Sequence, residues 1–328
     1  MIRKRTEHRN LLLIIVALLL LSGIFAPEYQ LDLLATAVLY GLFATSVDFS
    51  YGYAGILNMG SALYFGLGAY ITGYGLKAGI NPILLILIGM AVSVAIALII
   101  GYVGFRVKAS QVHFGIIGLA LTLGFEQLTI SLYDITGGSN GITNVPRPTF
   151  SLFGMEWTLT SPTVYYYFVI CVVLLSFFLL WKLANSDFGR AMLALRHDET
   201  KMETMGYNPL KVKMSVTGIT AAFSALSGAL FVPISGIAYP GLFGVTLSMS
   251  VLIWVALGGT GTLIGPFILG ALLKLSESTL SSNFEEIYML IIGLIFVTMV
   301  ILAPEGAINL LKRLIGWFTP QRSKNAGN

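Results

Sequence analysis

Charged side chains are concentrated in one polar segment, residues 185–213, which lies between long hydrophobic stretches. It holds five of the 19 Lys and Arg residues of the chain, together with Gly206 and the pair Asn208-Pro209, residue types that end or start helices. A short basic segment between lipid-soluble stretches is suited to contact a partner in the cytoplasm. Its basic residues are Arg190, Arg196, Lys201, Lys211 and Lys213.

The first part of this segment has the pattern of an amphipathic helix. Asp187 is an acidic start, which the helix dipole favours. The apolar residues that follow are spaced for one face, so the face can dock in a hydrophobic groove of a partner. The alternative is a helix on the membrane surface with its basic residues against anionic lipid. The residues of this face are Phe188, Ala191, Met192 and Leu195.

Four ionisable residues lie inside the hydrophobic stretches: Asp48, Glu126, Lys274 and Glu277. Charges in lipid are costly, so we expect these side chains to face the interior of a bundle or water. Lys274 and Glu277 are three residues apart and can neutralise each other on one helix face. Glu126 can line a pathway or clamp helices together. A proton relay would need more buried acidic and histidine side chains than these, so we do not expect one.

The sequence offers no catalytic or metal-binding constellation. It contains neither a phosphate-binding Gly-x-x-x-x-Gly-Lys-Ser/Thr loop nor even the dipeptide Gly-Lys, and it has no nucleophile elbow or His-Glu-x-x-His helix. The single cysteine, Cys171, lies in an apolar run, and His8, His113 and His197 are far apart. We therefore expect no catalytic residue, no metal and no cofactor bound by this chain itself.

The elements that carry these residues are membrane-spanning helices. Of the 328 residues, 56% are hydrophobic and only 10% are charged, and the mean hydropathy is +0.85. Apolar stretches of about 20 residues, long enough to cross a bilayer, recur along the chain. This predicts an all-α, polytopic bundle forming one domain over 1–328, with eight to ten spans. The expected spans are 11–26, 33–51, 60–76, 83–105, 114–133, 164–182, 214–234, 246–257, 263–281 and 287–303.

Ten spans place both termini and residues 185–213 on one side, and the loop of about 134–162 on the other. All Lys and Arg residues except Lys77, Arg147 and Lys274 then fall on the first side. By the positive-inside rule that side is the cytoplasm. The external loop is rich in turn residues and reads as a cap rather than a folded domain. The first span lacks a cleavage signal at its end and is expected to remain as an anchor.

Glycine-rich stretches interrupt the expected spans at two places. Residues 52–60 are too rich in glycine for a plain span, and Gly258–Gly265 follows the short span 246–257. Small residues allow close helix packing, while broken helices can line a pathway. We expect the second break to be a turn or a re-entrant element. The residues predicted for the pathway are Asn58, Glu126, Gly258, Gly259, Gly261 and Gly265.

Six motifs, in order, resemble the permeases of high-affinity branched-chain amino-acid ABC importers. The segment 189–196, GRAMLALR, followed by Glu199 and Met205-Gly206, is similar to the coupling loop of ABC importer permeases. The resemblance runs from about residue 33 to 306. The other five motifs are GLGAY at 66–70, TGGSNGI at 136–142, FSALSGAL at 223–230, GGTGTLIGP at 258–266 and APEG at 303–306.

The resemblance implies a membrane subunit of an ATP-driven importer in a bacterial inner membrane, working by alternating access. It implies a second homologous permease, two cytoplasmic ATP-binding subunits that hydrolyse ATP, and a periplasmic solute-binding protein. The expected coupling residues are Arg190, Arg196, Glu199 and Gly206.

Two departures from the pattern of this family bear on the identity of the transported solute. Thr200-Lys201-Met202 replaces the usual small residues after the coupling glutamate, and Pro304-Glu305-Gly306 replaces Pro-Arg-Gly. A permease for urea or short-chain amides is therefore an alternative to branched-chain amino acids. A carrier that works without ATP is a further alternative.

Overall fold

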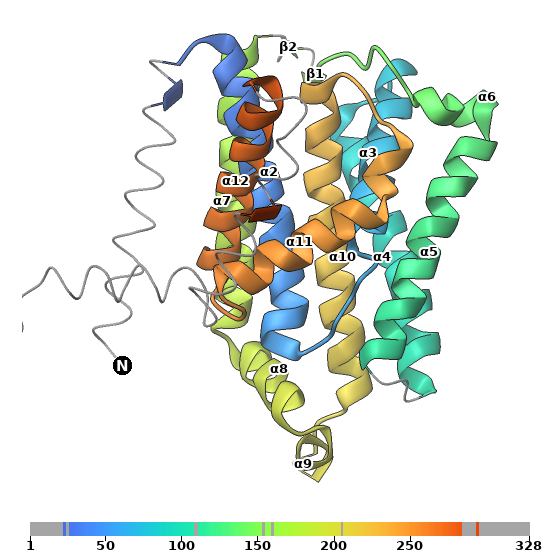
Figure 1. Ribbon diagram of the computed structural model, residues 1–328, viewed down its shortest axis with the longest axis vertical. Coiled ribbons are helices and arrows are strands. Elements are labelled where there is room, and N and C mark those ends of the chain that lie inside the picture. The colour runs from blue at the N-terminus through green and yellow to red at the C-terminus, as the bar shows by residue number, and fades with distance from the viewer. Residues whose placement is uncertain are drawn as a thin grey trace, which may run out of the picture.

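The computed structural model describes residues 22–23, 26–107, 111–152, 155–158, 161–204, 206–283 and 293–294. In these residues the chain is a bundle of helices with one two-stranded hairpin (Figure 1). The long helices are α2 (Glu28–Asp48), α3 (Ser61–Lys77), α4 (Pro82–Arg106), α5 (Gln111–Ser131), α7 (Pro162–Ala184), α10 (Pro209–Ser235), α11 (Val245–Gly258) and α12 (Ile264–Asn283).

Eight of the ten expected spans match these helices, and 11–26 and 287–303 lie wholly or mostly outside the described residues. Five helices of the described part are long and apolar enough to cross a membrane. These five are Glu28–Tyr53, Pro82–Arg106, Gln111–Ser131, Pro162–Ala184 and Pro209–Ser235. The polytopic, helical fold predicted from the sequence is confirmed.

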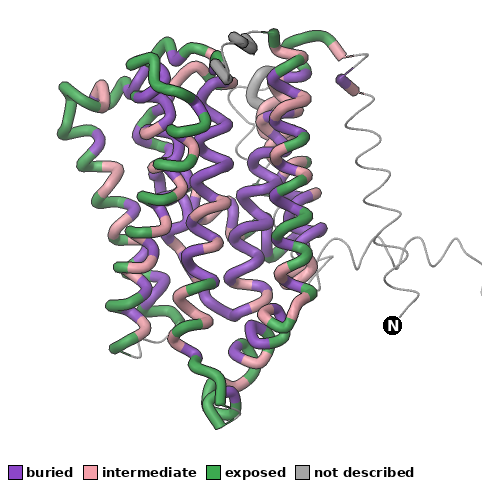
Figure 2. The backbone as a smooth tube through the Cα atoms, turned by 180° about the vertical axis from the view of Figure 1, so that it is seen from behind, coloured by how far each residue is buried: buried purple, intermediate pink, exposed green. Residues whose placement is uncertain are grey.

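The core is built around α2 and α10. Helix α2 packs against α7, α10 and α12, and α10 packs against α3 and α4 as well. Figure 2 shows these central helices almost continuously buried, whereas α4 and α5 keep exposed apolar faces. Such faces suit helices that border lipid or another membrane protein.

Two breaks in the helices have definite structures. The chain leaves α2 through a π-helical turn, Phe49–Tyr53, and passes through an extended stretch before α3. Helix α11 runs obliquely across the bundle, and α12 then reverses direction beside it (Figure 1). At the reversal a methyl group on Gly265 would lie 1.9 Å from the carbonyl oxygen of Gly258, so the two backbones touch. The predicted turn after 246–257 is confirmed.

The described residues of the loop 134–162 lie at the opposite end of the bundle from α8 (Asp187–His197) and α9 (Glu199–Thr204) (Figure 1). They contain the short helix α6 (Tyr133–Thr136), a 3-10 turn (Gly138–Asn140) and an antiparallel hairpin of β1 (Thr149–Leu152) and β2 (Met155–Thr158). Ile142 pairs with Ala238 through N–H···O bonds of 2.8 and 3.0 Å. The expected cap is thus anchored to the chain that follows α10, and it contains a hairpin that the turn-rich sequence did not predict.

Candidate functional site

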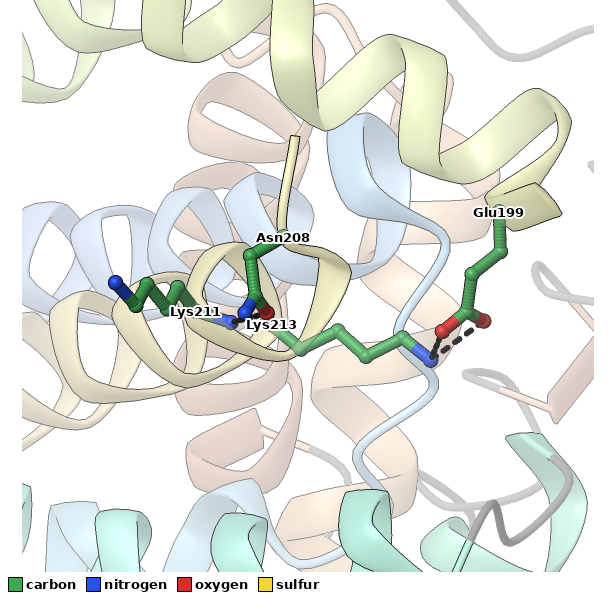
Figure 3. A network of polar contacts seen from close by, with 4 residues as sticks. All are labelled: Glu199, Asn208, Lys211 and Lys213. Atoms are coloured by element: carbon green, nitrogen blue, oxygen red, sulfur yellow. Dashed lines mark hydrogen bonds and ion pairs between the residues drawn. The ribbon is translucent and has the colours of Figure 1, made fainter. Parts of the chain in front are cut away.

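The polar segment 185–213 folds into two short helices, α8 and α9, and the start of α10, and side chains cap α9 and α10. Asp198 Oδ1 accepts the backbone N–H of Lys201 at 3.1 Å, which caps α9. Asn208 caps α10 in the same way, accepting the N–H of Lys211 at 3.1 Å (Figure 3). Between them, Gly206 has φ +82°, the left-handed conformation expected for a glycine that ends a helix. Helix punctuation read from the sequence is therefore confirmed at Gly206 and at Asn208-Pro209.

The apolar face of α8 differs from the sequence-based expectation. Ala191, Met192 and Leu195 are buried in this chain, and Phe188 packs against the same core. The contacts of α8 are with α7, α9, α10 and the π-helical turn. This face therefore fixes α8 to its own bundle, and neither a partner groove nor the membrane surface receives it. The pattern predicted the amphipathic helix correctly but assigned its apolar face to the wrong neighbour.

The opposite face of α8 is open to solvent. The Arg190 side chain is 80% exposed, and among the described residues its ion pair is with Asp187 of the same helix, which is 84% exposed. Exposed pairs of this kind contribute little to stability. Arg190 therefore contributes little to holding the fold together, and its expected role in contacting a partner protein stays a prediction.

Arg196 points the other way, toward the broken helices. Its Nη1 donates a hydrogen bond to the carbonyl oxygen of Gly52, in the π-helical turn after α2. Its side-chain carbons pack against Gly55, where an added methyl group would lie 3.1 Å from Arg196 Cγ. One side chain thus connects α8 to the interrupted stretch between α2 and α3.

At the same place, the buried carboxylate of Asp48 holds the turn between α11 and α12. Asp48 is fully buried at the end of α2. Its Oδ1 accepts the N–H of Gly261 at 2.7 Å, and its Oδ2 accepts the N–H of Leu263 at 2.9 Å. The guanidinium of Arg196 lies close enough to attract this carboxylate electrostatically. A buried charge is tolerated when it is hydrogen-bonded and lies near an opposite charge, and Asp48 meets both conditions.

Close backbone contacts complete this arrangement. We call it the polar node, and it consists of Asp48, Gly52, Arg196, Gly261 and Leu263. A methyl group on Gly52 would lie 2.1 Å from Asp48 Oδ1 and 2.2 Å from the Gly261 nitrogen. Gly261 has φ +79°, and an added methyl there would lie 3.5 Å from Arg196 Nη1. Four segments therefore meet at one point, where α8 contacts both helix breaks.

Glu199 forms a second connection, between α9 and α10. Both of its carboxylate oxygens lie 2.7 Å from Lys213 Nζ (Figure 3). Lys213 Nζ also lies 5.6 Å from the ring centroid of Phe105 at the end of α4. These three residues line two cavities of 490 and 260 Å³; Gly206 and Tyr207 line the larger one, and Gly55 and Leu195 the smaller. The surface around α9 is thus recessed and charged.

The predicted pathway residues do not form one group. The glycine break at Gly258–Gly265 belongs to the polar node, beside the predicted coupling residue Arg196. Asn58 is buried elsewhere, where its Oδ1 accepts the N–H of Gly60 at 2.9 Å and faces Gly118 of α5. Glu126 is half-buried on α5, about 12 Å further along the helix axis.

Sequence reasoning missed three members of this site. Asp48 was recognised as a charge in an apolar stretch, but its backbone partners are 213 and 215 residues away. Gly52 was noted only as one glycine among several, and Lys213 only as a basic residue. The signal that could have found Asp48 is a lone acid one turn before a glycine-rich break. No group of three or more acidic, His or Cys side chains suited to a metal ion occurs among the described residues.

Known proteins are similar to this chain over most of its length. A family model described as the permease component of branched-chain amino acid transport systems matches residues 29–300. The high-affinity branched-chain amino acid transport system permease protein LivM of Escherichia coli strain K12 is 29% identical over 325 residues, 90% of this chain and 74% of that protein.

Two further relatives are less similar in sequence. LivH of the same strain, also a permease protein of that system, is 24% identical, covering 81% of this chain and 90% of its own. The ribose import permease protein RbsC of Bacillus subtilis strain 168 is 27% identical, covering 80% of each chain. No solved structure matches. The chain is a multi-pass membrane protein that belongs to the family of branched-chain amino acid transport permeases.

Proposed function

We propose that this chain is the membrane-spanning permease subunit of an ATP-driven importer that carries branched-chain amino acids into the cell by alternating access. The family match supports this cargo over urea and short-chain amides. The observation that supports the mechanism is the polar node. An exposed helix, α8, reaches through Arg196 to the carbonyl of Gly52, beside the turn that Asp48 holds.

The proposed partners follow from the same features. Two ATP-binding subunits would contact the exposed face of α8 and the recessed surface around α9, and they would hydrolyse the ATP, since the sequence contains no phosphate-binding loop. A second, homologous permease would pair with this chain in the bilayer. A periplasmic solute-binding protein would deliver the amino acid at the end where residues 134–162 lie. We place the chain in a bacterial inner membrane, with both termini and α8–α9 in the cytoplasm.

The mechanism transmits motion through contacts already formed. Movement of the ATPase subunits displaces α8, and Arg196 passes that displacement to the stretch between α2 and α3 and to the turn between α11 and α12. These breaks are where helices can reorient, because no continuous helix resists the change. The three other expected coupling residues have different roles. Arg190 contacts the partner, Glu199 ties α9 to α10, and Gly206 sets the turn between them.

The test is uptake of radiolabelled leucine and of urea, separately, in cells that lack this chain. Uptake of each solute is compared with that of cells re-expressing wild type or Gly206→Asp, a substitution on a backbone at φ +82° where an added Cβ would meet no atom within 4 Å. We expect leucine uptake to need the chain and to fail in the variant, while the variant remains in the membrane. Uptake of urea alone would overturn the cargo. Leucine uptake that is unchanged in the variant would contradict coupling through this loop.

A further inference from the structure

A further polar cavity lies at the opposite end of the bundle from α8 and α9. It has a volume of 320 Å³ and lies where the first turns of α2, the end of α10 and the outer half of α12 meet. Ligand cavities in proteins start at about this size. Among the described residues its polar lining includes Asp32, Thr36, Ser235, Lys274 and Glu277.

The walls of this cavity carry both signs of charge. Lys274 Nζ lies 3.1 Å from Glu277 Oε2, and their side chains are 24% and 39% exposed. Asp32 lies on the facing helix, 28% exposed, where it pairs with Arg147 of the external loop at 2.6 Å. The Lys274 ammonium also lies 4.8 Å from the ring centroid of Tyr40. One cation and two carboxylates therefore line one half-buried space.

Stability does not explain the Lys274–Glu277 pair. An ion pair three residues apart on a helix contributes only about 0.2–0.5 kcal/mol. Partial burial of two ionisable groups in a membrane protein costs free energy, and such groups often mark functional sites. A ligand with the complementary pair of charges would offset this cost, because each group would then gain a second partner.

We propose that this cavity binds the zwitterionic head of an α-amino acid. Lys274 binds the ligand carboxylate, and Glu277 and Asp32 bind the ammonium group. Leu33 and Ile234 in the same wall accept an aliphatic side chain. The proposal rests on the proposed function, because it makes this cavity the place where the transported amino acid is received on the outer side. It adds that the site requires both charges of the ligand.

The test is ligand binding to the complete transporter complex in lipid nanodiscs, without the solute-binding protein, by saturation-transfer NMR with millimolar leucine. Competitors are isoleucine, with both charges, 3-methylbutylamine, with only the ammonium, and 4-methylpentanoate, with only the carboxylate. We expect isoleucine alone to compete. Lys274→Met and Glu277→Gln should each weaken leucine binding about tenfold or more, as the loss of a charge-assisted hydrogen bond implies.

Matched controls separate recognition from misfolding. Lys274→Arg keeps the cation and should retain binding. Lys201→Met breaks another pair with the same spacing, Asp198–Lys201, at the other end of the protein, and should leave binding unchanged. The inference is overturned if Lys274→Met and Glu277→Gln bind like wild type, if either singly charged analogue competes, or if wild type gives no signal although it transports leucine. Absence of leucine transport by wild type would instead count against the proposed function.

Discussion

Gly52→Ala tests the polar node with the smallest possible change. The added methyl would lie 2.1 Å from Asp48 Oδ1, 2.2 Å from the Gly261 nitrogen and 2.8 Å from the Gly261 Cα. Ordinary contact begins at 3.4 Å, so Asp48 Oδ1 must move about 1.3 Å and the Gly261 nitrogen about 1.2 Å away from the methyl. These two atoms form the 2.7 Å hydrogen bond from the Gly261 N–H to Asp48, so the methyl must lengthen or break that bond.

The expected cost combines overpacking and a weakened hydrogen bond to a buried charge. Overpacking costs about 1–3 kcal/mol, and a hydrogen bond to a charged group contributes about 1.5–3 kcal/mol. A combined loss of about 2 kcal/mol would lower the ratio of the closed to the opened node about 30-fold. We therefore expect ATP-dependent leucine uptake by the complete complex in proteoliposomes to fall by at least tenfold.

Gly218→Ala is the matched control. Gly218 is buried in α10, and an added methyl there would lie 3.6 Å from Leu98 Cδ2, an ordinary contact. Its uptake should stay within twofold of wild type at equal amounts in the membrane. Wild-type uptake by Gly52→Ala would refute the reasoning, because it would show that the node tolerates separation without loss of transport.

Three further changes probe neighbouring contacts. In Asp48→Asn, one of the two backbone N–H groups of the turn loses its acceptor, so we expect a destabilisation of about 1–3 kcal/mol, seen as a lower unfolding temperature of the purified protein; an unchanged temperature would contradict the bonding described here. For Glu199→Gln and Lys213→Met, a double-mutant cycle of unfolding should give a coupling of up to about 1 kcal/mol, because the pair is half-exposed, and zero coupling would mean that it does not tie α9 to α10. The pKa of Asp198 is lowered chiefly by the hydrogen bond that its carboxylate accepts from the backbone N–H of Lys201. The Asp198 cap therefore stabilises α9 at pH values above the ordinary pKa of aspartate, and this stabilisation is lost as the pH falls through the pKa of Asp198 in the folded protein. Hydrogen exchange of the Lys201 amide, corrected for its intrinsic rate, should lose protection below about pH 4 in wild type but not in Asp198→Asn, and pH-independent protection in wild type would contradict this.

The sequence predicted the elements whose signals are local. Hydropathy placed the long helices to within a few residues, since about 20 apolar residues can only span as a helix. Helix punctuation at Gly206 and at Asn208 was equally readable, because each acts on a backbone group within three residues. The turn at Gly258–Gly265 followed from its glycines and from the distribution of basic residues.

Contacts between distant segments were not readable in this way. Nothing beside Asp48 in the sequence shows that it holds residues 261 and 263, and the π-helical turn after it has no compositional signature. The apolar face of α8 was predicted but not its neighbour, because a pattern tells which side of a helix is buried and not what covers it. The grouping of Arg196 with the glycine break, and the separation of both from Asn58, depend on tertiary packing alone.

The most direct test of the central claim is the ratio of leucine transported to ATP hydrolysed by the reconstituted complex, for wild type and for Arg196→Ala. Wild-type transport should require hydrolysable ATP. In the variant we expect assembly and ATP hydrolysis to persist while leucine transported per ATP falls several-fold, because α8 has lost its bond to Gly52. An unchanged ratio in Arg196→Ala, or leucine uptake by wild type without ATP hydrolysis, would contradict the account.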